Sequence, residues 1–245
     1  MSEATAPRHL PDRLGSRTKD IVYSWETLLL LVLLAVFTIN SFASPYFLDP
    51  WNLSDATFNF TEKALIALAM ALLIISGEID LSVAAIVALA STAMGYIASI
   101  GGGTGAMVLA GILTGLACGA FNGLLVARFK LPSIVVTIGT MSLFRGMSFI
   151  VLGDGVFKGY PADFAFFGQG YVWWVFSFEF VFFLCAAAIY AMLLHKTKFG
   201  RLIYAIGNNE TAALFSGVRV ARVKFTLFLL TGLMSGIASV MLTSR

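Results

Sequence analysis

The chain has 245 residues, of which 59% are hydrophobic and only 12% are charged. A soluble domain has roughly 45–50% apolar and about 25% charged residues, so this composition excludes a soluble globular protein and, by the opposite imbalance, intrinsic disorder. The formal net charge of +3 is too small for a protein that binds nucleic acid. What remains is a polytopic membrane protein, with room for at most about ten spans of about 20 residues.

Apolar segments recur along the chain at lengths that suit membrane-spanning helices. The polar residues 1–24 contain no apolar stretch followed by a small-residue cleavage site, so we expect a cytoplasmic tail there, followed by a transmembrane domain over 25–245. The fold class predicted for that domain is all-α, a polytopic transmembrane helical bundle of about seven spans. The expected spans cover 28–42, 64–75, 81–100, 106–126, 134–152, 172–194 and 225–242.

Lysine and arginine concentrate in the cytoplasmic loops of membrane proteins. With the N-terminus inside, 12 of the 16 basic residues become cytoplasmic, in the tail, in the connection after the fourth span and in the long connection 195–224. Only Lys63 and Lys158 then lie in outside loops. The charge bias therefore agrees with a cytoplasmic N-terminus and seven crossings.

Two carboxylates interrupt the apolar pattern at Glu78 and Asp80, within the segment Ser-Gly-Glu-Ile-Asp-Leu-Ser at 76–82. The apolar segment before them has about 12 residues, which cover about 18 Å of a roughly 30 Å hydrocarbon core. Either that span begins back near Phe58 and the acids lie at the cytoplasmic surface, or they lie inside the membrane where Gly77 breaks the helix. Asp80 is well placed to cap the following helix. A break inside the membrane would line a path and a break at the surface would be a turn; both interpretations stand.

Glycine occupies every fourth position of the fourth span, at Gly111, Gly115, Gly119 and Gly123. Small residues at this spacing let a neighbouring membrane helix approach closely. We therefore expect these glycines to serve helix packing.

Arg145 lies inside the fifth span, after Thr137 and Thr140. An arginine in hydrocarbon is costly unless it pairs, reaches the interface or faces water. Two interpretations remain open, a place in a translocation path and a pairing with a carboxylate such as Glu179 of the sixth span.

Signatures of catalysis are missing from the sequence. It contains no GxxxxGK[ST] pattern, and the glycine-rich stretch 101–105 lacks the preceding strand and following lysine of a phosphate-binding loop. Its two histidines stand alone, with no triad and no metal-ligand spacing. We therefore predict no enzyme, and no metal ion or cofactor held by this chain.

The connection 195–224 has about 30 residues, whereas the other cytoplasmic connection has about seven. Within it, residues 208–216 predict a short helix that is opened by asparagine, carries Glu210 in its first turn and stops at Gly217. Such a helix, flanked by basic residues, could lie on anionic headgroups or dock into a groove of a soluble partner.

At this connection the sequence resembles the permease subunits of bacterial ABC importers for ribose-type sugars. The matching stretches here are Gly-Arg at 200–201, Tyr-Ala-Ile-Gly-Asn at 204–208, Ala-Ala at 212–213 and Ser-Gly-Val at 216–218. The segment 77–82 resembles the family's GGIDLS segment, and 121–126 with 131–133 and 136–141 resembles its next block. Together these stretches cover most of 65–242 in the family's order.

The resemblance implies that two permeases assemble in the bacterial inner membrane with two ATP-binding subunits and a periplasmic sugar-binding protein. ATP would be bound by the partner subunits only. The residues expected to couple to the ATPase are Gly207, Asn208, Glu210, Ala212, Ala213 and Gly217. The candidates for the translocation path are Glu78, Asp80, Ser82, Asn122, Thr137, Thr140 and Arg145.

Two departures from the family pattern qualify this expectation. Glu78 stands where the generic segment has its second glycine, which resembles the rhamnose-type branch. Family chains also continue beyond the last residue here, so we expect C-terminal spans to be missing and the chain to be truncated.

The function predicted from the sequence is that of an importer permease for a monosaccharide, rhamnose-like or ribose- or xylose-like. The alternatives are an autoinducer-2-type permease of the same family, a proton-coupled secondary transporter using Glu78 and Asp80, and a fragment that does not transport.

Overall fold

A computed structural model describes residues 24–245, so the expected cytoplasmic tail lies outside the described residues except for Ser24. Regular structure in the described part is helical apart from one two-stranded hairpin, which confirms the all-α expectation. The described residues fall into two units, 24–53 and 54–245.

The first unit contains α2 (Trp25–Ala43), a helix of 19 residues with no buried side chain. Ser24 caps it, since its hydroxyl accepts a hydrogen bond from the amide of Thr27 at 3.3 Å. The helix is long and apolar enough to cross a membrane, as expected for the first span. It is followed by α3 (Pro50–Phe58), where proline occupies the first helical position and the Asp49 carboxylate accepts from the amide of Trp51 at 2.8 Å.

The second unit holds the remaining elements. They are α4 (Thr61–Ile75), α5 (Val83–Ser99), α6 (Thr104–Gly123), the π-helical turn η1 (Leu124–Arg128), α7 (Ser133–Leu152), the 3-10 turn η2 (Ala162–Ala165), α8 (Phe166–Gln169), β1 (Tyr171–Trp173), β2 (Phe176–Ser177), α9 (Phe178–Lys196), α10 (Lys198–Asn208), α11 (Glu210–Phe215) and α12 (Val220–Thr243).

Within the described residues, five helices are long and apolar enough to cross a membrane. A sixth span results if α3 and α4, bent by 53° at their junction, count as one, and α5 is a shorter apolar helix. Each of the seven expected segments therefore coincides with an apolar helix.

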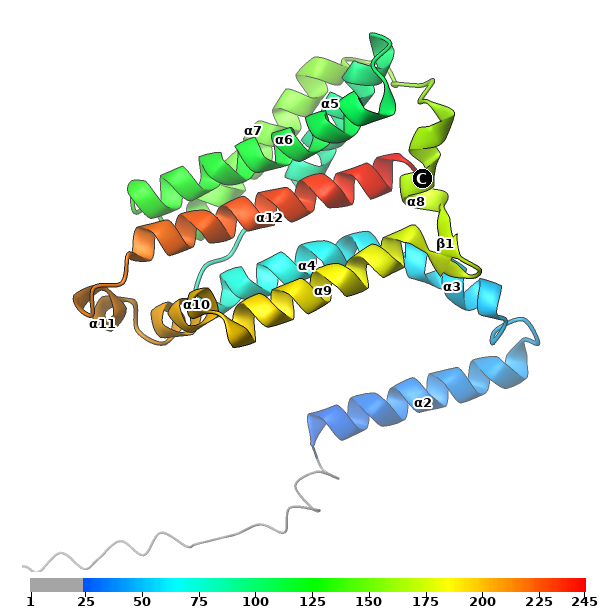
Figure 1. The fold of residues 1–245 in the computed structure, drawn as a ribbon, viewed down its shortest axis with the longest axis horizontal. Coiled ribbons are helices and arrows are strands. Elements are labelled where there is room, and N and C mark those ends of the chain that lie inside the picture. The colour runs from blue at the N-terminus through cyan, green and yellow to red at the C-terminus, as the bar shows by residue number, and fades with distance from the viewer. Residues whose placement is uncertain (1–23) are drawn as a thin grey trace, which may run out of the picture. The chain divides into compact units, whose positions relative to one another are not determined.

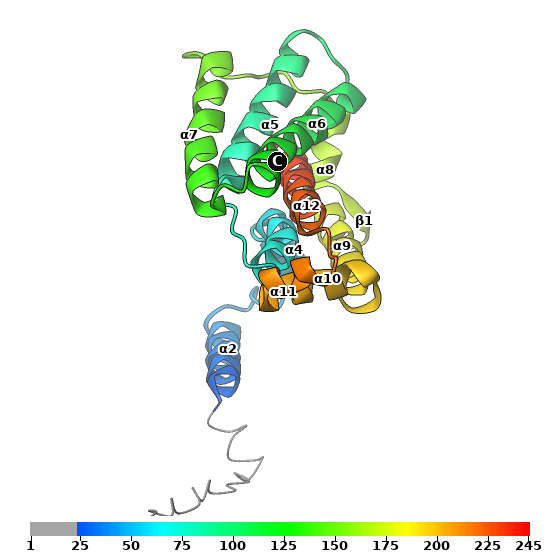
Figure 2. The same cartoon turned by 90° about the vertical axis from the view of Figure 1, so that its left-hand side faces the viewer.

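Helix α12 is the centre of the second unit. It packs against α4, α5 and α6, and Figures 1 and 2 show it running between α5 and α6 on one side and α4 and α9 on the other. Of its most apolar stretch 61% is buried, against 17–33% for α6, α7 and α9. The last span in the sequence is thus surrounded by the earlier ones.

Glycine brings α12 and α6 into backbone contact. A Cβ added to Gly119 would lie 2.5 Å from the carbonyl oxygen of Phe228, and one added to Gly115 would lie 2.8 Å from the Cα of Gly236. Gly232 meets Gly115 and Gly119 from the other side. Close approach of two helices through small residues is how membrane helices gain packing energy without a hydrophobic driving force.

The two outer glycines of the same stripe contact other groups. Gly111 faces the Met94 sulfur of α5, and Gly123 faces Phe225 and Phe228 of α12. The glycines at 115, 119 and 123 thus face α12, whereas Gly111, nearest the start of α6, faces α5.

Two expected span boundaries are wrong. The sixth span begins at Phe178 rather than 172, because residues 171–177 form the hairpin of β1 and β2. Most of these residues are aromatic or valine, types that favour strands. The seventh begins at Val220 rather than 225, because its polar first turns continue the helix. Lys224 consequently belongs to α12 and not to the preceding loop.

Basic connections gather at one end of the second unit, where α10 and α11 lie, whereas β1 and α8 lie at the other end (Figure 1). The end of η1 and the connection after it share cavities with the start of α12. One cavity is lined by Arg128 and Arg222, and the other by Lys130 and Lys224. At the opposite end, the guanidinium of Arg245 donates to the carbonyl of Phe58 at 2.7 Å. This segregation agrees with the orientation inferred from charge.

The glycine contact makes a first prediction. Replacing Gly119 by alanine should destabilise the protein by about 1–3 kcal/mol, because the added methyl overlaps the α12 backbone and the helices must separate. Thermal unfolding in detergent measures this. The matched control is Gly139→Ala in α7, where no atom lies within 4 Å of the added Cβ; it should gain the roughly 0.5–1 kcal/mol of helix propensity. Equal melting temperatures for the two variants would contradict the prediction.

Candidate functional site

The segment between α4 and α5 is an irregular turn. Gly77 adopts φ of +85°, a conformation that favours glycine, and directs the chain away from the α4 axis. The amide of Ile79 then donates to the hydroxyl of Ser133 at 3.3 Å, which attaches the turn to the start of α7. Helix α4 therefore ends just before Gly77, where both interpretations of this segment place an interruption.

A buried polar cluster follows directly. The Asp80 carboxylate oxygen Oδ1 accepts from the Ser82 hydroxyl at 2.6 Å and from the Ser82 amide at 2.8 Å. The side-chain amide of Asn122, on α6, donates to the same hydroxyl at 2.8 Å. Asp80 therefore binds Ser82, the N-cap residue of α5, and not an amide within the helix, so the expectation that Asp80 itself caps α5 is wrong: it lies two positions before the cap.

Two oxygens of this cluster have no hydrogen-bond donor among the described protein groups, Asp80 Oδ2 and Asn122 Oδ1. Both residues are at most 1% exposed. A buried acceptor without a donor is costly, so the cluster suits a small donor such as water or a solute hydroxyl.

The hydrogen bonds found for the other path candidates among the described residues do not reach this cluster. Thr137 and Thr140 are buried on α7, and their hydroxyls donate to carbonyls of their own helix. Arg145 is exposed, whereas Glu179 is 1% exposed on α9. No ion pair joins these two residues in the part of the chain described, so the pairing interpretation of Arg145 is not supported.

Lys224 forms the main ionic contact of the unit. Its ammonium lies 2.5 Å from a carboxylate oxygen of Glu78 and 2.7 Å from one of Glu210. The side chains of Lys224 and Glu78 are 10% and 12% exposed, and that of Glu210 is 55% exposed. Sequence reasoning counted Lys224 only as a loop charge. One sequence signal could have suggested the pair: Glu78 and Lys224 are opposite charges that each lie beside an apolar segment, where a charge requires a partner.

This contact also bears on the position of Glu78. The residue lies at the end of the unit that carries α10, α11 and the basic connections, because it pairs with Lys224 at the start of α12. The geometry supports the interpretation in which Glu78 lies at the cytoplasmic surface.

Helix α11 has the ends that the sequence predicts. The Asn209 side chain accepts from the amide of Ala212 at 2.9 Å, and Gly217 with φ of +83° follows the helix. Ala213 is buried, whereas Leu214 and Phe215 are 56% and 86% exposed. Two large apolar side chains thus project from a short helix.

Helix α10 rests directly on the end of α4. Gly207 lies so close to the carbonyl of Ile75 that no Cβ fits between them. The adjoining Asn208 is the last residue of α10, and Asn209 separates it from α11. The loop helices are therefore held against the membrane-spanning helices through backbone contact.

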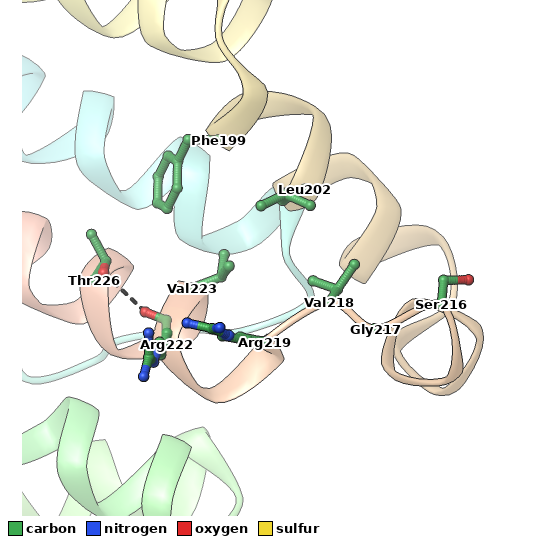
Figure 3. Close-up of a pocket in the computed structure, with 9 residues that line it drawn as sticks. All are labelled: Phe199, Leu202, Ser216, Gly217, Val218, Arg219, Arg222, Val223 and Thr226. Carbon is green, nitrogen blue, oxygen red and sulfur yellow. Dashed lines mark hydrogen bonds between the residues drawn. The ribbon is translucent and has the colours of Figure 1, made fainter.

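An open cavity of about 480 Å³ lies beside α11, between α10 and the start of α12. Figure 3 shows Phe199 and Leu202 of α10 on one side of it and Arg219 and Arg222 on the other. The remaining lining residues are Ser216, Gly217, Val218, Val223 and Thr226. This surface combines apolar walls with a basic rim, a composition typical of a docking surface rather than of a catalytic site.

The fold and this site define a class, a polytopic α-helical membrane protein with a structured connection between its last two spans. The model of the family described as "Branched-chain amino acid transport system / permease component" matches residues 52–245. The chain belongs to this family of permease components.

Similar curated proteins include the ribose import permease protein RbsC of Bacillus subtilis, 37% identical over 88% of this chain and 67% of that protein. The L-arabinose ABC transporter permease protein AraH of Azospirillum brasilense is 35% identical over 100% of this chain and 74% of its own length. The autoinducer 2 import system permease protein LsrC of Escherichia coli O157:H7 is 30% identical over 93% of this chain and 66% of that protein. No solved structure matches the chain. With the apolar helices, these matches identify a multi-pass protein of the bacterial inner membrane.

The buried cluster makes a second prediction. Ser82→Ala removes the hydroxyl that joins Asp80 to Asn122. The buried side-chain amide of Asn122 then lacks its acceptor, while Asp80 Oδ1 keeps the Ser82 amide, so the change should cost about 1–3 kcal/mol of stability. Ser99→Ala is the control, because the Ser99 hydroxyl is exposed and donates only to a carbonyl of its own helix. Thermal unfolding of both purified variants checks this, and a Ser82→Ala melting temperature equal to that of the control would refute the described network.

Proposed function

We propose that this chain is the membrane-spanning permease subunit of an ABC importer that moves a monosaccharide or sugar-like solute into the cytoplasm. ATP is hydrolysed by a separate subunit, which binds at α11. The observation that carries the proposal is the exposure of Leu214 and Phe215 on a capped helix at the basic end of a bundle that belongs to a permease family. Large apolar side chains at such a position favour a protein partner over water.

The basic residues around α11 leave a second partner to consider, an anionic membrane surface. Helix α11 has six residues, too few to bury a long apolar face in headgroups. The cavity beside it instead presents a concave wall next to the projecting Phe215. A short helix with an adjoining hollow suits insertion into a groove of a folded protein.

The substrate class follows from the relatives and the buried cluster. The relatives above are named for ribose, L-arabinose and autoinducer 2, and none of the three is named for rhamnose. The unpartnered oxygens of Asp80 and Asn122 are acceptors that suit the hydroxyl groups of a sugar. We therefore propose a pentose or a similar polyhydroxylated solute; for rhamnose the support is Glu78 alone.

In the proposed mechanism, ATP binding closes the partner subunits and displaces α11. The displacement reaches the bundle through α10, which contacts α4, and through α12, which occupies the centre. Packed helices move as rigid bodies, so the path opens alternately to the two sides. A second permease subunit completes the path, and a periplasmic binding protein delivers the solute.

No observation favours the proton-coupled alternative. Glu78 forms an ion pair with Lys224, and Asp80 accepts hydrogen bonds from Ser82, so both carboxylates are already engaged within the protein. Transport that stops with an uncoupler while ATP stays high would restore that alternative. Binding to an ATPase without transport in vesicles would instead indicate a partner-binding fragment.

The docking of α11 makes a third prediction. Phe215→Asp should reduce the yield of co-purified ATPase subunit at least tenfold, because a carboxylate replaces the most exposed apolar side chain of the helix, and loss of an aromatic anchor typically costs 2 kcal/mol or more. Val156→Asp is the control, since Val156 is 74% exposed in the loop after α7, at the opposite end of that helix from η1. Undiminished recovery with Phe215→Asp would overturn the proposed docking site.

A further inference from the structure

Lys224 connects three segments that are distant in sequence. It belongs to the second turn of α12 and contacts Glu78 in the turn between α4 and α5 and Glu210 at the start of α11. The helix that carries it is the most buried in the unit, so the ammonium is held at a defined place. The two acids, in contrast, belong to a turn and to a short loop helix.

The two ion pairs differ in their exposure. Lys224 and Glu78 are 10% and 12% exposed, so their attraction is weakly screened by solvent, whereas Glu210 is 55% exposed. A displacement of α11 therefore breaks the pair with Glu210 more easily than the pair with Glu78. The inner pair persists, and its strength depends on whether the second carboxylate shares the lysine.

Space for such a displacement exists next to the three charges. A cavity of about 350 Å³ is lined by Glu78, Glu210 and Lys224, by Leu214 of α11 and by the connection between η1 and α7. A movement of α11 into this cavity, whose wall also includes Val220 and Ala221 of α12, would change the Glu210 contact. Lys130 also lines the cavity.

We propose that Lys224 is a positioning residue that links α11 to the turn of residues 76–82. When α11 moves against its partner, Glu210 shifts relative to Lys224, which changes how firmly Lys224 holds Glu78 and hence the turn that leads to Asp80 and α5. The inference rests on the proposed function, because it requires that an ATPase subunit displaces α11. It assigns a role to the acid that distinguishes this chain from the generic family segment.

Amide hydrogen exchange of the complex with the ATPase subunit tests this link without knowledge of the solute. Exchange is measured without nucleotide and with a nonhydrolysable ATP analogue. In the unaltered complex, nucleotide should change the exchange rates of both 210–215 and 76–82 by about fivefold or more, the lower end of typical coupling between sites. In Lys224→Met the change at 210–215 should persist, and the change at 76–82 should fall below about twofold.

Three further variants separate positioning from folding. Lys224→Arg keeps the charge and should retain the response at 76–82. Glu78→Gln keeps the ion pair between Lys224 and Glu210 but should lose the nucleotide response at 76–82. This variant tests the link even if Lys224→Met fails to fold. Lys130→Met is the matched control, because Lys130 lines the same cavity and no ion pair is found for it in residues 24–245; it should respond like the unaltered chain.

The outcomes distinguish this inference from the proposed function. A nucleotide response at 76–82 that survives both Lys224→Met and Glu78→Gln overturns the role of Lys224, and so does a response of the unaltered complex confined to 210–215. If 210–215 itself shows no response in the unaltered complex, the coupling role of α11 fails and the proposed function fails with it.

Discussion

The backbone contact between α6 and α12 is the constraint on which the second unit depends. Glycines at 115 and 119 meet those at 232 and 236 so closely that side chains between the helices would overlap main-chain atoms. In a bundle surrounded by lipid, this contact replaces the hydrophobic driving force that packs soluble helices. It places the last helix of the chain in the centre, with α4 and α9 on one side and α5 and α6 on the other (Figure 1). The position of every charge on α12 follows from that placement.

The central position of α12 brings the start of this helix next to two other segments. Because the helix begins at Val220, its second turn carries Lys224 to the turn between α4 and α5 and to the start of α11. A lysine with a side chain that is 10% exposed requires neighbouring carboxylates, and both are supplied by segments that the family resemblance associates with transport. The charged residues of this membrane protein are few, and three of them converge at one place.

The buried cluster of Asp80, Ser82 and Asn122 is a second place where α5 and α6 depend on each other. It lies only two residues beyond Glu78, so the ionic contact at the surface and the polar contact in the interior belong to one continuous turn. Two buried acceptors in it lack donors, which is unusual in a packed interior and is consistent with a site that accepts hydrogen bonds from a solute.

The sequence by itself determined the class of the protein, the seven apolar segments, the orientation that the charges favour, and the short helix opened by Asn209 and followed by Gly217. These features depend on composition and on residues close together in the chain, which is why they are predictable. Only the tertiary structure decided that Lys224 joins Glu78 and Glu210, that Asn122 reaches Ser82 across 40 positions, and that Arg145 lies apart from Glu179. It also decided that residues 171–177 pair as a hairpin, although they continue an apolar run. Such contacts depend on which helices pack side by side, and here the glycine contact between α6 and α12, together with the packing around it, sets that arrangement.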